Sequence, residues 1–376
     1  MAPIERRVWA TLLALAILYG QVPLAHAGTL RRVWEIDLRK LVHAGEGSPE
    51  FPVFAIRFSP DGRKLAVIAD VYETHDGRRS RLLVSDVAHP TGNVQQFEVE
   101  FGILENEAGR GWALNFGWSP SSEIIYALGK VIHLSSGATC DLPNQSVFIS
   151  DDLAISARPY PPPLYSSTQV TFFNSSCEER ARWDVPEGWI ISDVSMDRRL
   201  LSVLKETNNP TETERLIVDP MGRKVLQRWS ENVGGAWEFA DGGKTVCQGG
   251  DVLQSDRAPA RCRNVDTGKE IGETLDTNGV EPIATASQAR RLVASDYRRK
   301  KIPFDYEYQT TFKGRFVWDF GTGQKLASWY PEFETYPNVF KPTKQITEPF
   351  RFAMSPDGQY VAEGGNGIIR LYKIEP

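Results

Sequence analysis

Residues that could support acid–base, nucleophilic or metal chemistry are few in this sequence and lie far apart. The five histidines are His26, His43, His75, His89 and His133, and none has a metal-ligand spacing such as H-x-H or H-E-x-x-H. No G-x-S-x-G nucleophile motif occurs. Asp151 and Asp152 are adjacent, but they follow an apolar stretch at an expected turn, where aspartates usually cap backbone groups. The sequence therefore predicts no local catalytic motif, no metal site and no cofactor.

The segment best suited to recognition is the basic run YRRKK at positions 297–301, which leads into several aromatic residues. Arginine and tyrosine dominate the binding energy of protein–protein interfaces, and arginine beside aromatic rings also suits anionic or sugar ligands. We therefore expect binding residues at Arg298, Arg299, Lys300, Tyr306 and Tyr308. A solvated hairpin tip is the alternative interpretation of this run.

A second candidate is the segment YPPPLY at positions 160–165, whose prolines favour a polyproline II conformation. It is either a stiff rim element or a presented recognition segment. Its tyrosines, Tyr160 and Tyr165, and Arg78 from another long connection are expected on the same surface as the basic run.

The elements that must position these residues are revealed by a repeated turn. FSPDG at 58–62 and MSPDG at 354–358 each join two short apolar strands. Aspartate can cap its own backbone in such a turn and glycine tolerates positive φ. Weaker copies complete a set of seven, which begin at Phe58, Phe116, Phe148, Val194, Trp237, Ala284 and Phe352. Phe58 to Phe352 spans 294 residues over six intervals, or 49 residues per repeat, which is typical of a propeller with enlarged loops.

A second marker follows each turn, most clearly the strand RFVWD at 315–319 with the turn GTG at 321–323. With these two markers the chain resembles the WD40-type β-propeller family, and it is similar to the exported YVTN-like propellers. The Gly-His dipeptide of regular WD40 repeats is absent, and only Trp318-Asp319 is a Trp-Asp pair within one of these strand-and-turn markers. The resemblance implies an all-β fold, a divergent seven-bladed β-propeller of four-stranded antiparallel blades.

The two ends of the chain are expected to close the ring. The last repeat supplies three strands, and residues 30–38 form an unassigned strand near the start. Placing this N-terminal strand on the outside of the last blade completes that blade and covers an exposed sheet edge.

Residues 1–27 have the pattern of a secretory signal peptide, and residues 28–376 form the single propeller domain. Arg6 and Arg7 precede an apolar stretch, and Ala25-His26-Ala27 is a small-x-small cleavage site. An uncleaved membrane anchor is the alternative. Without the leader the chain carries 41 basic and 47 acidic side chains, which argues against a nucleic-acid partner. We expect an exported protein, periplasmic or extracellular, with no membrane span after cleavage.

All four cysteines follow the leader, an even number that permits disulfides in an exported protein. Cys247 and Cys262 fall on expected neighbouring strands and form the preferred pair, which leaves Cys140 and Cys177 as the second pair. Metal ligation is the alternative, but no C-x-x-C motif supports it.

A propeller blade directs its connections to two faces. The turn face carries the first-to-second and third-to-fourth strand turns, and the hairpin face carries the second-to-third strand connections and the links between blades. The long segments all belong to the hairpin face: 71–80, 101–111, 158–167, 205–214, 249–260, 297–314 and 330–349. Binding residues concentrate on loops held by a rigid scaffold, although propeller loops also vary without functional meaning.

The expected function is therefore a non-catalytic scaffold that binds an unidentified protein partner, as a monomer, through the hairpin face. The alternative is a propeller-type enzyme, either a lactonase-like hydrolase or a quinoprotein-like oxidoreductase, with its site in the central channel. The channel lining separates these hypotheses, because converging acidic, histidine or asparagine side chains would favour the enzyme.

Overall fold

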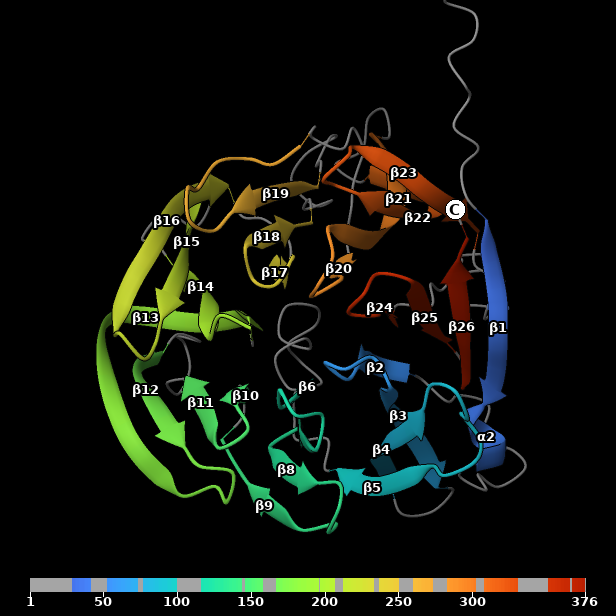
Figure 1. The fold of residues 1–376 in the computed structure, drawn as a ribbon, viewed down its shortest axis with the longest axis horizontal. Helices are drawn as coiled ribbons and strands as arrows, with labels where there is room; N and C mark the ends of the chain where they lie inside the picture. Colours follow the sequence, from blue (N-terminus) through green and yellow to red (C-terminus); the bar gives the residue numbers. More distant parts are fainter. Residues whose placement is uncertain are drawn as a thin grey trace, which may run out of the picture.

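A computed structural model of the chain shows a closed ring of small β-sheets around a central axis (Figure 1). It describes residues 29–41, 53–73, 77–99, 116–143, 146–157, 167–195, 197–206, 212–232, 237–249, 260–272, 283–301, 308–330, 351–365 and 367–375. The predicted leader and the segment 160–165 lie outside these residues. Within the described ranges, no helix is long and apolar enough to cross a membrane.

The first three blades follow the chain from the inner to the outer strand. Blade 1 contains β2 (Val53–Phe58), β3 (Lys64–Glu73), β4 (Gly77–Asp86) and β5 (Gln95–Val99). Blade 2 contains β6 (Phe116–Trp118), β7 (Ile124–Ala127), β8 (Lys130–His133) and β9 (Thr139–Asp141). Blade 3 contains β10 (Ser146–Ser150), β11 (Leu153–Ala157), β12 (Ser167–Phe173) and the first part of β13 (Glu179–Ser195).

Four further blades complete the ring. Blade 4 contains the second part of β13, β14 (Leu200–Glu206), β15 (Glu212–Asp219) and β16 (Lys224–Asn232). Blade 5 contains β17 (Trp237–Ala240), β18 (Thr245–Gln248), β19 (Arg261–Asn264) and a fourth position marked by the bridge Arg263↔Glu270. Blade 6 contains β20 (Ile283–Thr285), β21 (Arg291–Lys301), β22 (Tyr308–Asp319) and β23 (Gln324–Trp329). Blade 7 contains β24 (Arg351–Met354), β25 (Tyr360–Gly365), β26 (Ile368–Ile374) and β1 (Leu30–Asp37). The predicted seven antiparallel blades are confirmed.

Blades 3 and 4 share one strand. The start of β13 pairs with β12, as in Val170↔Trp183, and its end pairs with β14, as in Ile191↔Val203. One strand is therefore both the outer strand of blade 3 and the inner strand of blade 4, which produces a seven-stranded sheet.

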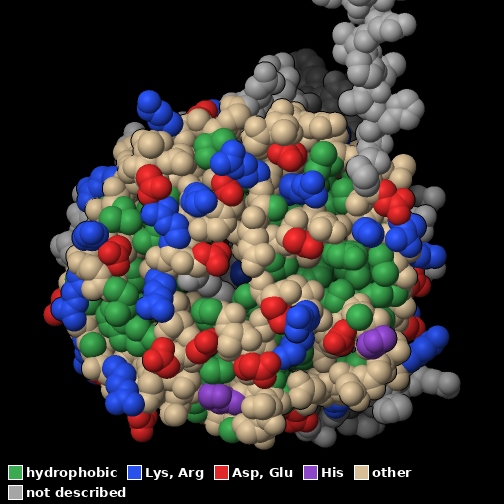
Figure 2. Space-filling model, viewed as in Figure 1, with side chains coloured by type: hydrophobic (Ala, Val, Ile, Leu, Met, Phe, Trp, Pro, Cys, Tyr) green, Lys and Arg blue, Asp and Glu red, His purple; other side chains and the backbone are tan. Residues whose placement is uncertain are grey.

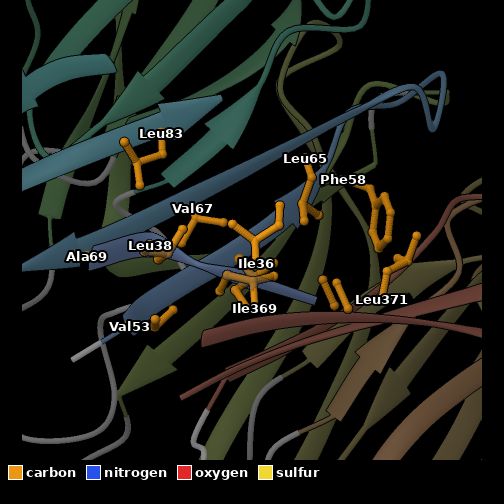
Figure 3. Close-up of a cluster of buried hydrophobic side chains, with 13 residues drawn as sticks. Ile36, Leu38, Val53, Phe58, Leu65, Val67, Ala69, Leu83, Ile369 and Leu371 are labelled. Carbon is orange, nitrogen blue, oxygen red and sulfur yellow. The ribbon is translucent and has the colours of Figure 1, made fainter. Parts of the chain in front are cut away.

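The N-terminal strand closes the ring as predicted. β1 pairs antiparallel with β26 from Leu30↔Ile374 to Asp37↔Ile368. Beyond it, α2 (Leu38–Leu41) begins with a hydrogen bond from the Leu38 N–H to the carbonyl of Gly367 (2.7 Å). Ile36 and Leu38 then pack with strands of blades 1 and 7 in a buried cluster that also includes Val67 and Ile369 (Figure 3). This contact joins the first and last blades through their cores.

The repeated turn has the geometry that its sequence predicts. In blade 1 the Ser59 hydroxyl donates to Asp61 Oδ1 (2.6 Å) and accepts from the Lys64 N–H (2.8 Å). In blade 7, Ser355 makes the same bonds to Asp357 (2.6 Å) and Tyr360 (2.9 Å). The following glycines have φ values of 72° and 67°. In these two turns serine, aspartate and glycine each satisfy a different part of one tight turn.

Neighbouring turns on the turn face are hydrogen-bonded to each other. The Ser121 N–H donates to Asp151 Oδ1 between blades 2 and 3 (2.7 Å), which agrees with the predicted capping role of this aspartate. The Gly242 N–H donates to the Ser287 carbonyl between blades 5 and 6 (2.6 Å), and the Gln288 N–H donates to the Pro356 carbonyl between blades 6 and 7 (2.9 Å). Hydrogen bonds therefore link the turns of the turn face at these three blade junctions.

Both predicted disulfides are present. Cys247 and Cys262 are direct cross-strand partners on β18 and β19. Cys140 lies on β9 of blade 2, and Cys177 lies in the β12–β13 turn of blade 3. The first bridge therefore joins two strands of one blade, and the second joins two blades.

Several segments expected as loops are partly β-structure. The predicted loop 297–314 is largely a hairpin, because β21 and β22 pair out to Lys301↔Tyr308. The predicted loops 71–80 and 205–214 likewise contain paired ends of β3–β4 and β14–β15, out to Glu73↔Gly77 and Glu206↔Thr213. Aromatic and β-branched residues such as Tyr308, Thr310 and Thr311 favour the extended pairing despite the charged run opposite them.

Candidate functional site

The inner strands place equivalent residues around the central channel. In each blade the turn after the inner strand opens with a serine or an alanine. The residue two positions before it is, from blade 1 to blade 7, Arg57, Gly117, Phe148, Asp193, Glu238, Ala284 and Ala353. Most of these residues are small or apolar. At these seven positions, charged residues occur only in blade 1, as arginine, and in blades 4 and 5, as aspartate and glutamate.

A cavity of about 260 Å³ occupies the channel at this layer. Its lining includes Arg57, Asp193 and Glu238, together with Arg351 from the start of β24. At ~30 Å³ per molecule, this volume corresponds to about nine waters. Space remains because Ala284 and Ala353 stand where longer side chains would fill the channel. Turn residues, including Pro60 and Gly243, also line it, so the cavity belongs to the turn-face end of the channel.

The two carboxylates are fixed by backbone hydrogen bonds from the next blade. Asp193 Oδ2 accepts a hydrogen bond from the Phe239 N–H (2.6 Å). Glu238 Oε2 accepts one from the Thr285 N–H (2.8 Å), and the Thr285 hydroxyl lies 3.3 Å from the same oxygen. That hydroxyl also donates to the Phe239 carbonyl (2.7 Å). Blades 4, 5 and 6 are therefore joined at the channel by two acidic side chains in succession.

These acids share one electrostatic environment with Arg57. Burial raises the pKa of Asp193 well above that of an ordinary aspartic acid, and the positive charge of Arg57 opposes this rise. Burial also raises the pKa of Glu238, the negative charge of Asp193 raises it further, and Arg57 again acts in the opposite direction. Blade 1 lies across the ring from blades 4 and 5 (Figure 1), so Arg57 offsets the two acids from the other side of the channel.

Arg351 adds a second guanidinium to the lining, and burial lowers its pKa. The cavity thus presents two acidic and two basic groups around a small enclosed space. Such a set can bind a small polar or charged organic molecule, or exchange a proton with it. Among the residues that the structure describes, no group of three or more His, Cys, Asp and Glu side chains is placed to hold a metal ion.

Four of the surface residues predicted to bind lie in the hairpin of blade 6, away from the channel lining. Arg298, Arg299 and Lys300 lie on β21, and Tyr308 begins β22, in the outer part of the blade 6 hairpin. Their cross-strand partners are Thr311, Thr310 and Gln309 for the three basic residues, and Lys301 for Tyr308.

The other predicted binding residues are not shown to join this group. Arg78 lies on β4 opposite Tyr72, in the hairpin of blade 1. Blade 7 separates blades 1 and 6 in the ring (Figure 1). Tyr160, Tyr165 and Tyr306 lie outside the described residues. The grouping of these residues into one site therefore stays a prediction.

Sequence reasoning missed the channel residues, although a signal for them was present. Asp193 directly precedes one copy of the repeated turn marker, and Glu238 lies within another. Aligning the seven markers places both at the same offset as Arg57, and this offset identifies a shared layer of the channel.

Comparisons with known proteins agree with this fold. No family model matches the chain, and no curated protein matches it. Among solved structures, a chain of the crystal structure of the mitotic checkpoint complex is similar, with 11% identity, a TM-score of 0.56 and coverage of 95% of each chain. A chain of hydrazine synthase from Kuenenia stuttgartiensis is similar with 11% identity and a TM-score of 0.54, over 88% of this chain and 97% of that one. At this identity the likeness shows the fold alone, which is that of a β-propeller.

Proposed function

We propose that the protein is an exported, non-catalytic binding scaffold that holds a protein partner through its hairpin face. The observation that carries this proposal is the long arm formed by β21 and β22. The neighbouring strands end at Ile283↔Ala294 and Arg315↔Trp329, whereas β21 and β22 continue for six further pairs. At about 3.3 Å per residue, this arm extends roughly 20 Å beyond the blade.

Such an arm is expected to contribute little to the stability of the fold. An isolated two-stranded hairpin is marginally stable in water, and this one contains four consecutive basic residues, Arg298 to Lys301. Residues of this composition on a projecting element are more useful for binding than for packing. The β3–β4 hairpin extends past its neighbours in the same direction, by three pairs from Val71↔Arg79 to Glu73↔Gly77. The similar chain from the mitotic checkpoint complex belongs to an assembly, which is consistent with a scaffold role here.

Export is the second part of the proposal. It is supported by the leader pattern at residues 1–27 and by two disulfides, which persist in oxidising compartments.

The test is affinity capture of the mature protein from its own envelope or secreted fraction, with identification by mass spectrometry. One variant reverses three charges on the arm, as Arg298→Glu, Arg299→Glu and Lys300→Glu. A matched control reverses three exposed charges on the turn face, as Arg63→Glu, Lys244→Glu and Lys269→Glu. A partner captured by the native protein and the control, but lost by the arm variant, supports the proposal. Capture of the same partner by all three proteins contradicts it.

A second candidate function, chemistry or ligand binding in the channel, is favoured by the charged set of Asp193, Glu238, Arg57 and Arg351. Its test is native mass spectrometry of the protein purified from its source. A bound small molecule that is lost in the Glu238→Gln variant would support it. An empty native protein would count against it.

A further inference from the structure

Exposed apolar side chains are concentrated at one turn of blade 4. Among the described residues, the large hydrophobic side chains that are exposed are Val33, Met221, Val225, Leu226 and Tyr330. Three of these five fall between positions 221 and 226, at the β15–β16 turn and the start of β16, with exposed fractions of 55%, 38% and 36%. Single exposed hydrophobic residues need no explanation, but a group on one short element marks an interaction surface.

The turn that carries them is held in place by its own contacts. Asp219 Oδ1 accepts a hydrogen bond from the Gly222 N–H (2.8 Å), and Arg223 follows with a φ of 51°. Met221 therefore sits at the tip of a defined turn.

A groove of about 620 Å³ lies beside this turn, between blades 4 and 5. Met221 and Leu226 line one side, and Arg198 and Arg199 of the β13–β14 turn also contribute to it. Val265 and Asp266, from the turn after β19, complete the lining from blade 5. All three turns belong to the turn face, so this groove is on the opposite side of the ring from the long hairpins.

The charges around the groove are unbalanced toward the positive. Arg198 pairs with Asp266 (2.7 Å), and Lys224 lies 4.0 Å from Asp219, whose other oxygen caps the turn. Both acids of the lining are therefore used internally. Arg199 in the lining and Arg223 beside it are exposed and form no ion pair with another described residue, although the charge of Arg199 helps to lower the pKa of Asp152. This local surplus contrasts with the net charge of −5 for the whole chain.

We propose that this groove is a docking site for an acidic peptide segment of a partner protein. The segment inserts a bulky apolar side chain between Met221 and Leu226 and places carboxylates beside Arg199 and Arg223. Figure 2 shows hydrophobic side chains bordered by lysine and arginine over the part of the ring that carries β13 to β16. Arginine and methionine are both enriched at protein interfaces, and charge complementarity gives the orientation of the bound segment.

The same charges argue against a second copy of this chain as the occupant. A symmetric dimer through the groove would place one patch against itself. Arg199 and Arg223 of one copy would then face the same arginines of the other, with the nearby carboxylates already paired.

The test uses a fluorescein-labelled hexapeptide, Asp-Glu-Leu-Phe-Glu-Asp, and fluorescence anisotropy with the mature protein. Control peptides replace the acids with lysine or the Leu-Phe pair with Ser-Ser. We expect the acidic apolar peptide to bind, more weakly at 300 mM than at 50 mM salt because exposed charges are screened. The variants Met221→Ser/Leu226→Ser and Arg199→Glu/Arg223→Glu should each weaken binding by about tenfold or more, equivalent to ~1.4 kcal/mol.

A matched variant away from the groove, Val33→Ser/Arg63→Glu, should bind like the native protein. All of these positions are exposed or at the surface, so circular dichroism should show unchanged folding. No binding of the acidic apolar peptide, or equal binding by the groove variants, would overturn the proposal. A concentration-dependent dimer in sedimentation velocity that the groove variants abolish would also overturn it, because the occupant would then be a second copy.

Discussion

Replacing Glu238 with glutamine should remove a large part of the pH dependence of folding stability. Burial and the neighbouring Asp193 raise the pKa of Glu238 to about 7 in the folded protein, whereas a glutamic acid without such neighbours, as in the unfolded chain, has a pKa of 4.5. The folded state therefore binds the proton more tightly. This contribution to stability is complete below about pH 4.5 and is lost as the pH rises through about 7.

The size of the effect follows from this difference in pKa. A shift of about 2.5 units, at about 1.4 kcal/mol per unit, corresponds to about 3 kcal/mol. Glu238 keeps part of its surface exposed to the channel, and solvent screening reduces this figure to about 2 kcal/mol. Glutamine retains an oxygen that can accept the hydrogen bond from the Thr285 N–H, and Arg57 keeps Asp193 as a partner. The Glu238→Gln variant should therefore match the native protein near pH 4.5 and exceed its stability by about 2 kcal/mol at pH 8.

The assay is urea-induced unfolding of both proteins at pH 4.5, 6, 7 and 8, with disulfides intact. A control variant, Asp141→Asn, removes an exposed acid from β9 and should leave the pH profile unchanged. The reasoning would be refuted if the stability difference between Glu238→Gln and the native protein stayed constant across this range. Such a result would mean that the channel carboxyl has an ordinary pKa.

Three further predictions concern the closure of the ring. Arg315 and Glu363 form an ion pair between blades 6 and 7, with 1% and 0% of their side chains exposed. Arg315→Met should cost about 3–5 kcal/mol in urea unfolding, and adding Glu363→Leu should recover most of that loss; a cost below about 1 kcal/mol would contradict the assignment. The Cys140→Ser/Cys177→Ser variant removes a disulfide with a sequence separation of 37. Because the unfolded chain then gains conformational entropy, the free energy of unfolding should fall by about 4 kcal/mol. An unchanged free energy of unfolding would contradict this. Deleting residues 1–37 exposes the edge of β26 and should cause self-association in size-exclusion chromatography, which a synthetic β1 peptide reverses.

The repeats could be predicted because each blade contains its own local signal. Ser59 and Asp61 bond to each other and to the adjacent backbone, and the same is true of Ser355 and Asp357. A turn whose hydrogen bonds lie within a few neighbouring residues can be identified from the sequence of those residues alone. The closing strand was predictable for a related reason, since the last repeat lacked a fourth strand.

The channel site could not be predicted in this way because its parts are distant in the sequence. Arg57 belongs to the first blade, and Asp193 and Glu238 belong to the fourth and fifth. Each is one charged residue in a short apolar strand, and nothing in the neighbouring sequence distinguishes it from a charged residue without a function. Only the closed ring brings them to a single cavity.

The hairpin of blade 6 shows a different limit. The run Arg298 to Lys301 has the composition of a solvated loop, and its pairing depends on residues that follow it, including Thr310 and Thr311. The sequence indicated a segment rich in basic residues, but it did not show that this segment continues a paired strand out to Lys301.

The arrangement of the two faces bears on how each can bind. The turns of the turn face are hydrogen-bonded to one another from blade to blade, for example through Gly242 and Ser287. A ligand that binds there meets groups already fixed in position, so little conformational entropy is lost. Within the described part of the chain, the strands that flank the blade 6 arm end at Ile283 and Trp329. Asp197, which lines the channel cavity, directly precedes the arginines that line the groove. The β13–β14 turn therefore contributes both to the channel lining and to the groove, so a segment docked in the groove contacts an element that also borders the channel.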